Sequence, residues 1–458
     1  MKQGKCLLKF FIISLGLASF CSPVSLAQII HQRDPAIAEM VQEVSEKNIE
    51  SIIRRLASFH TRHSLSDTMN DKRGIGAARR WIKAELERYV KDSGGRLRVE
   101  FDRFVVEPDK RRIPYRIAMA NVLATLPGAD LGDKRVFIVS GHYDSRASDP
   151  LDSTSYAPGA NDDASGTAVS MELARAMSKR QFPATIIFAA VAGEEQGLYG
   201  SAHLAQRAKQ ENWNVVAMIT NDIVGNTRSS GTNLLDNTHV RVFSEGVPAA
   251  ETERMAQLRP SIGSENDGPS RQFARYIKEI GERYVDQMNV TLIYRRDRFL
   301  RGGDHTPFNR LGFTAVRITE MNEDFTRQHQ NVRVENGISY GDVPEHVDFA
   351  YVAQVARVNL AAFANLALAP AAPDSVGIVT KELANETQLR WKTPSGRAPA
   401  GYHVLMRETT SPIWMKKFAV GNVTQTTLPY SKDNYFFAVQ SVDAAGRESL
   451  PVFPLPAQ

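Results

Sequence analysis

The feature that most constrains this fold is an alternation of short apolar runs with longer amphipathic stretches between residues 98 and 368. Several runs are continuously apolar, which is typical of strands covered on both faces of a sheet. The runs span residues 98–106, 121–126, 135–140, 184–190, 215–219, 290–294 and 313–318, and the helical stretches span 167–179, 202–210, 270–288 and 349–368. Residues 28–368 are therefore expected to form a three-layer α/β/α domain around a mixed, mostly parallel central sheet.

A second, smaller domain is expected after a linker at residues 369–374, which is rich in alanine and proline. Short alternating runs follow the linker and are separated by Gly, Pro, Asn and Asp, a pattern typical of a small all-β sandwich. Residues 375–458 resemble a fibronectin type III module, with Trp391, Tyr402 and Leu428 at plausible core positions. We expect this module to bind a surface or another protein.

Residues 1–27 have the features of a signal peptide, with lysines followed by an apolar run and a small-x-small cleavage site at Ser25-Leu26-Ala27. The alternative, a retained membrane anchor, is disfavoured because the run is too short to span a bilayer. We expect an exported protein, periplasmic or secreted, with no membrane span after cleavage.

The expected mature chain contains no cysteine, because the two that the protein has, Cys6 and Cys21, both lie in the signal segment. A disulfide, a thiolate nucleophile and a Cys-ligated metal are thereby excluded. Cleavage also removes three lysines and no acidic residue, so the formal charge of +5 falls by three. The remaining charge gives no reason to expect nucleic-acid binding.

Polar side chains follow several of the apolar runs, where open α/β sheets place their functional sites. His142 and Asp144 come after the run at 135–140, and side chains two positions apart in extended chain share a face. Asp144 is therefore placed to orient the ring of His142. Asp162 and Asp163 are adjacent carboxylates in a glycine-flanked loop, which predicts either a bound cation or an acidic helix cap.

Further candidate ligands follow the later runs. Glu194 and Glu195 come directly after residues 184–190, where one metal ligand and one general base would explain both. Asp222 ends another run, and His305 lies in a glycine-rich loop. Two histidines with several carboxylates and no cysteine suit Zn²⁺ better than Ca²⁺ or Mg²⁺. The number of carboxylates favours two ions that share a bridging ligand.

In chain order these motifs resemble those of the co-catalytic zinc aminopeptidases of metallopeptidase family 28. The motifs are His-x-Asp at 142–144, Pro-Gly-Ala-Asn-Asp-Asp-x-Ser-Gly at 158–166, Gly-Glu-Glu-x-Gly-Leu-x-Gly-Ser at 193–201, Asn-Asp at 221–222 and Asp-His at 304–305. The resemblance extends from about residue 51 to about residue 368. It implies a zinc exopeptidase-like fold and two Zn²⁺ per chain.

The resemblance also implies a role for each metal-binding residue. His142 and Asp222 are expected to bind one ion, Glu195 and His305 the other, and Asp162 is expected to bridge both. The remaining histidines, His329 among them, are expected to be surface or packing residues.

Two more residues have implied roles in catalysis. Glu194 is expected to be the general base that deprotonates the water bridging the ions, which leaves a hydroxide as the nucleophile, and Asp144 the partner of His142. The peptide bond between Asp162 and Asp163 is expected to be cis.

The function that the resemblance implies is hydrolysis of N-terminal residues from peptides that have a free amino end. A carboxypeptidase or dipeptidase is an alternative, because the basic segment 294–301 could bind a substrate carboxylate. A single-zinc glutaminyl cyclase shares the implied fold but is disfavoured by the full ligand set. A binding protein whose catalytic domain is idle is the remaining alternative.

Overall fold

The structure is a computed structural model that describes residues 32–381 and 383–457. The predicted signal segment lies outside these residues. Among the helices described, none is both long enough and apolar enough to cross a membrane.

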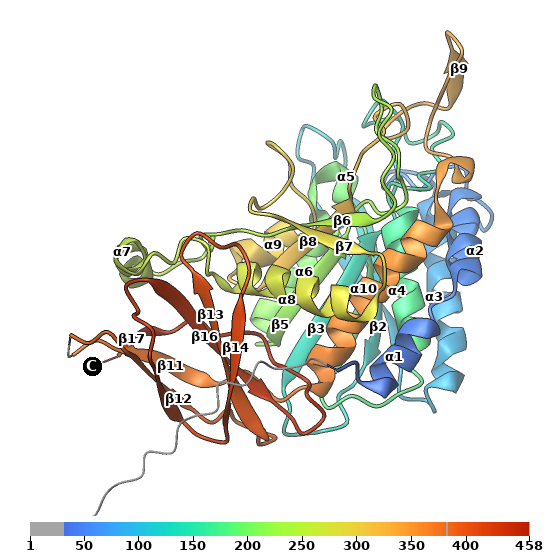
Figure 1. Cartoon of the computed structure of the whole chain (residues 1–458). Coiled ribbons are helices and arrows are strands. Elements are labelled where there is room, and N and C mark those ends of the chain that lie inside the picture. The colour runs from blue at the N-terminus through green and yellow to red at the C-terminus, as the bar shows by residue number, and fades with distance from the viewer. Residues whose placement is uncertain (1–31, 382, 458) are drawn as a thin grey trace, which may run out of the picture.

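An eight-stranded mixed sheet forms the centre of the larger domain (Figure 1). Strands β3, β4, β5 and β8 run parallel to one another in the middle of the sheet, and β6 and β7 run parallel to each other at one edge. The antiparallel pairs are β1 with β2, β2 with β4 and β6 with β8. Across the sheet, the strands are β1 (Arg98–Val106), β2 (Ile117–Leu126), β4 (Thr185–Val191), β3 (Arg135–His142), β5 (Asn214–Asn221), β8 (Ala315–Glu320), β6 (His239–Phe243) and β7 (Asn289–Ile293).

Helices cover both faces of this sheet, which confirms the predicted three layers. Successive residues of β3 belong to different cores, since Phe137 and Val139 pack into the larger apolar cluster and Ile138 into the smaller. The helices of the larger cluster are α1 (Pro35–Gln42), α2 (Glu46–Ala57), α3 (Gly74–Asp92), α4 (Ala164–Met177), α8 (Pro269–Tyr284) and α10 (Phe349–Leu368). The smaller cluster is covered by α6 (Tyr199–Gln210) and α9 (His305–Arg310).

The elements that sequence periodicity does not predict are short or exposed. Strand β6 has only five residues, and α7 (Glu253–Ile262) buries none of its residues. Strands β9 (Arg333–Glu335) and β10 (Ile338–Tyr340) form an exposed hairpin, followed by the 3₁₀ helix η1 (Pro344–His346). Period-based prediction fails on such elements because they have no continuous buried face.

Close packing of α4 against the sheet brings separate strand ends together. Gly166, in the first turn of α4, lies so near β5 that an added Cβ would stand 1.9 Å from the carbonyl oxygen of Asn221. A larger residue would push the start of α4 away from the sheet. This contact places the loop before α4 beside the ends of β3 and β5.

The C-terminal residues form a sandwich of a four-stranded and a three-stranded sheet. Its core contains Trp391, Tyr402, Leu428 and Phe437. The first sheet consists of β15 (Gln425–Leu428), β12 (Thr387–Lys392), β11 (Asp374–Val379) and β17 (Leu455–Ala457), and the second of β14 (Lys416–Gly421), β13 (Gly401–Glu408) and β16 (Tyr435–Val442). The resemblance to a fibronectin type III module stays a prediction.

The sandwich is joined to the larger domain by buried ion pairs along α8. Asp267 accepts hydrogen bonds from Arg275 at 2.9 Å and from Arg407 of β13 at 2.6 Å, and all three side chains are almost fully buried. Glu448 of the sandwich pairs in the same way with Arg283 of α8 at 2.9 Å. Pairs that are withdrawn from water in this way tolerate the loss of a partner poorly.

We therefore expect Asp267→Asn to destabilise the protein. The change leaves the buried guanidinium groups of Arg275 and Arg407 without their shared counter-charge, at a cost of roughly 3 kcal/mol or more. Thermal or denaturant unfolding should show this loss. Glu107→Gln is the control, because its pair with Arg116 is exposed and such pairs contribute little. Equal stability of the two variants would contradict the prediction.

Candidate metal centre

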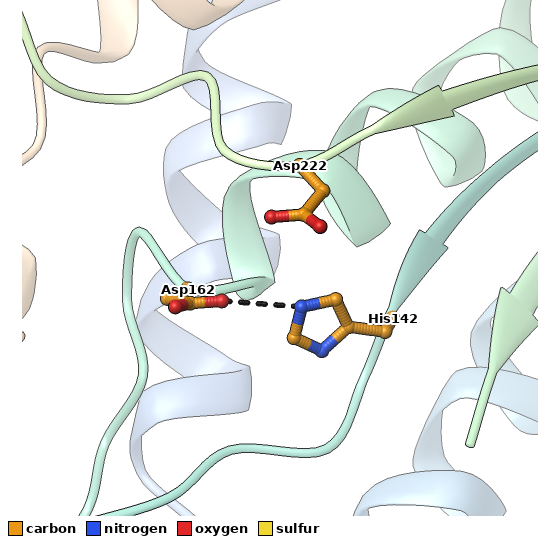
Figure 2. A group of neighbouring side chains, drawn as sticks. All are labelled: His142, Asp162 and Asp222. Carbon is orange, nitrogen blue, oxygen red and sulfur yellow. Dashed lines mark ion pairs between the residues drawn. The ribbon is translucent and has the colours of Figure 1, made fainter. Parts of the chain in front are cut away.

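His142, Asp162 and Asp222 meet where β3 and β5 end and α4 begins (Figure 2). Each offers a ligand atom, and the three atoms lie within 4.8 Å of one another. His142 Nε2 is 3.1 Å from Asp162 Oδ1. All three side chains are buried, so a cation placed among them would be largely shielded from water.

A second group of possible ligands shares Asp162. It consists of Asp162, Glu195 and His329, whose ligand atoms also lie within 4.8 Å of one another. His329 Nε2 is 3.0 Å from Asp162 Oδ2 and 2.9 Å from Glu195 Oε1. The two oxygens of Asp162 thus face different histidines, His142 on one side and His329 on the other. This is the arrangement that a bridging carboxylate requires.

The second carboxylate of the acidic pair has a structural role. Asp163 is the N-cap of α4, and its Oδ1 accepts from the amide of Gly166 at 2.9 Å. Its Oδ2 accepts from the amide of His142 at 2.9 Å. The helix-cap alternative is therefore confirmed for Asp163, whereas Asp162 faces the other possible ligands and the bound cation stays a prediction. The peptide bond between them is cis, as expected.

Asp144 lies beside His142, as the His-x-Asp spacing predicts. Its Oδ1 is 3.6 Å from His142 Nδ1, and the same ring nitrogen is 3.2 Å from the Asp144 carbonyl oxygen. The carboxylate also accepts from the amides of Glu194 at 3.3 Å and Glu195 at 3.1 Å. Asp144 therefore links the end of β3 to the residues that follow β4.

Glu194 begins the short helix α5 (Glu194–Gly197) next to the second ligand group. Burial raises the pKa of its carboxyl well above the ordinary value, and the charges of Asp222 and Glu195 raise it further against an opposing effect of His142. A carboxylate with a raised pKa is a stronger base than an exposed one.

The structure does not bring His305 to either group, which corrects the prediction that it binds the second ion. Its Nε2 donates to the carbonyl oxygen of Arg296 at 2.8 Å, and burial lowers the pKa of the ring to about 4. The place expected of His305 is occupied by His329, which the sequence indicated only as a surface or packing residue. The available signal was that His329, like the other candidates, follows a strand of the sheet, β8.

The chemistry of the two groups fits zinc. Together they offer two imidazoles and three carboxylates without cysteine, a set typical of zinc sites. Burial lowers the pKa of His329, but Glu195 and Asp162 outweigh it and raise that pKa to about 10. Three carboxylates share the site with two imidazoles, and such an excess of acidic groups suits divalent cations.

Comparison with known proteins agrees with this donor set. Residues 121–343 match the model of peptidase family M28. A protein of Leptosphaeria maculans named as a probable zinc metalloprotease is 49% identical over 420 residues, which cover 92% of this chain and 97% of the relative. A probable zinc metalloprotease of Pyricularia oryzae is 44% identical over 95% of this chain and 87% of its own length.

Solved structures share the fold at low sequence identity. The LapA aminopeptidase of Legionella pneumophila superposes with a TM-score of 0.52 at 18% identity, covering 75% of this chain and 77% of LapA. An aminopeptidase from Aneurinibacillus sp. strain AM-1 gives a TM-score of 0.50 at 15% identity, covering 71% and 95%. With relatives this similar over nearly its whole length, the chain belongs to peptidase family M28, a family of zinc metalloproteases.

Proposed function

We propose that this metalloprotease is an exopeptidase that removes residues from the free amino end of peptides, with two zinc ions in the paired site. The observation that carries the proposal is the sharing of Asp162 by two ligand groups beside Glu194, one buried and the other partly exposed at His329. His142 and Asp222 would hold one ion, and Glu195 and His329 the other. The aminopeptidase folds that superpose on this chain support the same class of substrate.

The arginines of residues 295–301, which motivate the carboxypeptidase alternative, are partly engaged within the chain. Arg298 donates to Glu323 at 2.9 Å and Arg301 lies 3.6 Å from the same carboxylate. Arg295 lies over the ring of Phe299 at 5.2 Å. Glu323 also accepts a hydrogen bond from Arg241 at 3.0 Å, and Arg295 and Arg296 are exposed, so part of the cluster stays accessible to a substrate carboxylate. The end of the peptide that is cleaved therefore decides between the two alternatives.

Each catalytic residue then has a defined task. Bound zinc ions lower the pKa of water and polarise a carbonyl oxygen. Glu194 would take a proton from the attacking water and deliver it to the leaving amine, a role that its raised pKa favours. Asp144 would keep the ring of His142 and the amides of Glu194 and Glu195 in place.

We further propose that the protein is exported to the periplasm or the exterior, on the basis of the basic and apolar composition of residues 1–27. The expected partners are peptides with a free N-terminus, together with a surface or protein bound by the C-terminal sandwich.

Incubation of the zinc-loaded protein with a set of peptides should establish the end at which it acts. We expect mass spectrometry to show unblocked peptides shortening stepwise from the amino end, while N-acetylated versions stay intact. Shortening from the carboxyl end would instead support the carboxypeptidase alternative. Loss of ammonia from Gln-initiated peptides without cleavage would indicate a cyclase.

Glu194→Gln should keep the bound zinc but lose turnover. The amide has nearly the same shape and cannot accept the proton, so kcat should fall by about 10²–10⁴-fold. Zinc content and kcat should both be measured. Glu195→Gln is the neighbouring control, because changing a ligand should lower zinc content as well. A fully active, metal-loaded Glu194→Gln protein would exclude this residue as the base.

His329→Gln and His305→Gln should differ in bound metal. We expect His329→Gln to lose about one zinc ion per chain and most activity, because the second group then lacks its imidazole. His305→Gln should keep both ions, since His305 contacts a backbone carbonyl rather than the ligand groups. Metal analysis after dialysis against a weak chelator distinguishes the two. The opposite result would restore His305 as the ligand.

A further inference from the structure

Arg317 is a fully buried arginine in contact with one of the proposed ligands. It lies on β8, and its Nη2 donates to Asp222 Oδ1 at 2.8 Å. Its Nη1 donates to Asp297 Oδ2 at 3.2 Å and to the carbonyl oxygen of Gly302 at 3.2 Å. One guanidinium therefore fixes Asp222, Asp297 and the glycine-rich loop before α9.

Asp297 supplies the counter-charge for this arginine. Burial alone would raise the pKa of Asp297, but the charges of Arg317, His305 and Arg298 outweigh it and lower the pKa to about 2. Asp297 is thus ionised at neutral pH. Arg298 Nε also donates to Asp297, at 3.3 Å, so two arginines hold Asp297 and Arg317 is shared between two carboxylates rather than paired with Asp222 alone.

The loop before α9 is shaped around the guanidinium. A Cβ on Gly303 would lie 2.9 Å from Arg317 Nη1, so glycine is the residue that allows this approach. His305 holds the other side of the arrangement, since its Nε2 lies 3.7 Å from Asp297 Oδ2 and donates to Arg296. His305 thereby has a role that is separate from metal binding.

We propose that Arg317 is a positioning residue that fixes the carboxylate of Asp222 for metal binding, with Asp297 as its counter-charge. The inference rests on the proposed function, in which Asp222 is a zinc ligand. A carboxylate oxygen has two acceptor directions, so Asp222 Oδ1 can receive this hydrogen bond while the group still binds an ion. Without the bond, Asp222 could turn within a pocket that already holds the carboxylates of Asp163 and Glu194.

The shape of the arginine side chain is part of the proposal. A planar guanidinium can donate to two carboxylates at once, whereas a lysine ammonium keeps the charge but does not reproduce the rigid fork. Loss of an outer contact to a metal ligand typically weakens metal binding by about 10–100-fold. Arg317→Lys should therefore weaken zinc at the His142–Asp222 position by a factor in that range.

The matched control is Arg135→Lys. Arg135 is a buried arginine at the opposite end of the sheet, where it pairs with Asp133 at 2.6 Å and donates to the carbonyl oxygen of Ala369 at 2.8 Å. Its replacement removes similar contacts without touching a ligand. We expect its thermal midpoint to fall while both zinc affinities stay at the wild-type values.

The test measures zinc affinity of the full chain by competition with a chromogenic chelator, and the absorption spectrum after substitution with Co²⁺. Arg317→Lys should bind one of two ions more weakly and change the cobalt spectrum. Asp297→Asn should have the same effect. Arg317 then lacks its second charged partner and pairs more strongly with Asp222, which weakens the binding of the ion by that carboxylate. Asp297→Asn also provides a second variant if Arg317→Lys does not fold.

The outcomes separate this inference from the proposed function. If either folded variant keeps both affinities and the cobalt spectrum, Arg317 has only a structural role and the inference is wrong. If His142→Ala binds as much zinc as the wild-type protein, the metal assignment itself fails. That result would overturn the proposed function before Arg317 is considered.

Discussion

The burial of many like charges at one edge of the sheet is the constraint on which the rest of this structure depends. Carboxylates withdrawn from water repel one another and need donors or cations close by. Here three buried carboxylates that are not proposed as ligands accept hydrogen bonds from the backbone amides of proposed ligands, and so hold those residues in place. The pairs are Asp163 with His142, Asp144 with Glu195, and Asp342 with Asp162.

Two buried arginines extend this arrangement beyond the backbone amides. Arg317 links Asp222 to the loop before α9. Arg62 donates to the carbonyl oxygens of Tyr143 and Gly159, and so ties the segment after His142 to the segment before Asp162. Each arginine holds two loops at once, which is a geometric task that a single backbone amide cannot perform. The ligand positions are therefore fixed by a network of contacts within the chain. Because the ligands are already in place, less reorganisation is needed when cations bind.

The parts that the sequence predicts are those that local pattern determines. Runs of buried residues indicated the central strands, and β1 and α10 have the predicted bounds. Four of the five predicted ligands also come together, because each lies at a strand end or helix start that the pattern locates. The carboxyl ends of parallel strands meet at one edge of the sheet, so motifs distant in sequence become neighbours without any contact having to be predicted separately.

The parts that the sequence does not predict depend on contacts between distant segments. His329 lies in a loop without periodic pattern, and a neighbouring motif with histidine, at His305, was the stronger local signal. The contacts of the C-terminal sandwich with the larger domain were likewise not predicted, because the composition of the linker indicated a separate module. Asp267 and Arg407 are 140 positions apart, and nothing in either local segment indicates that they pair. Because that pair and the one between Arg283 and Glu448 are buried, the sandwich is held against α8 as part of the same folded body rather than carried loosely behind the catalytic domain.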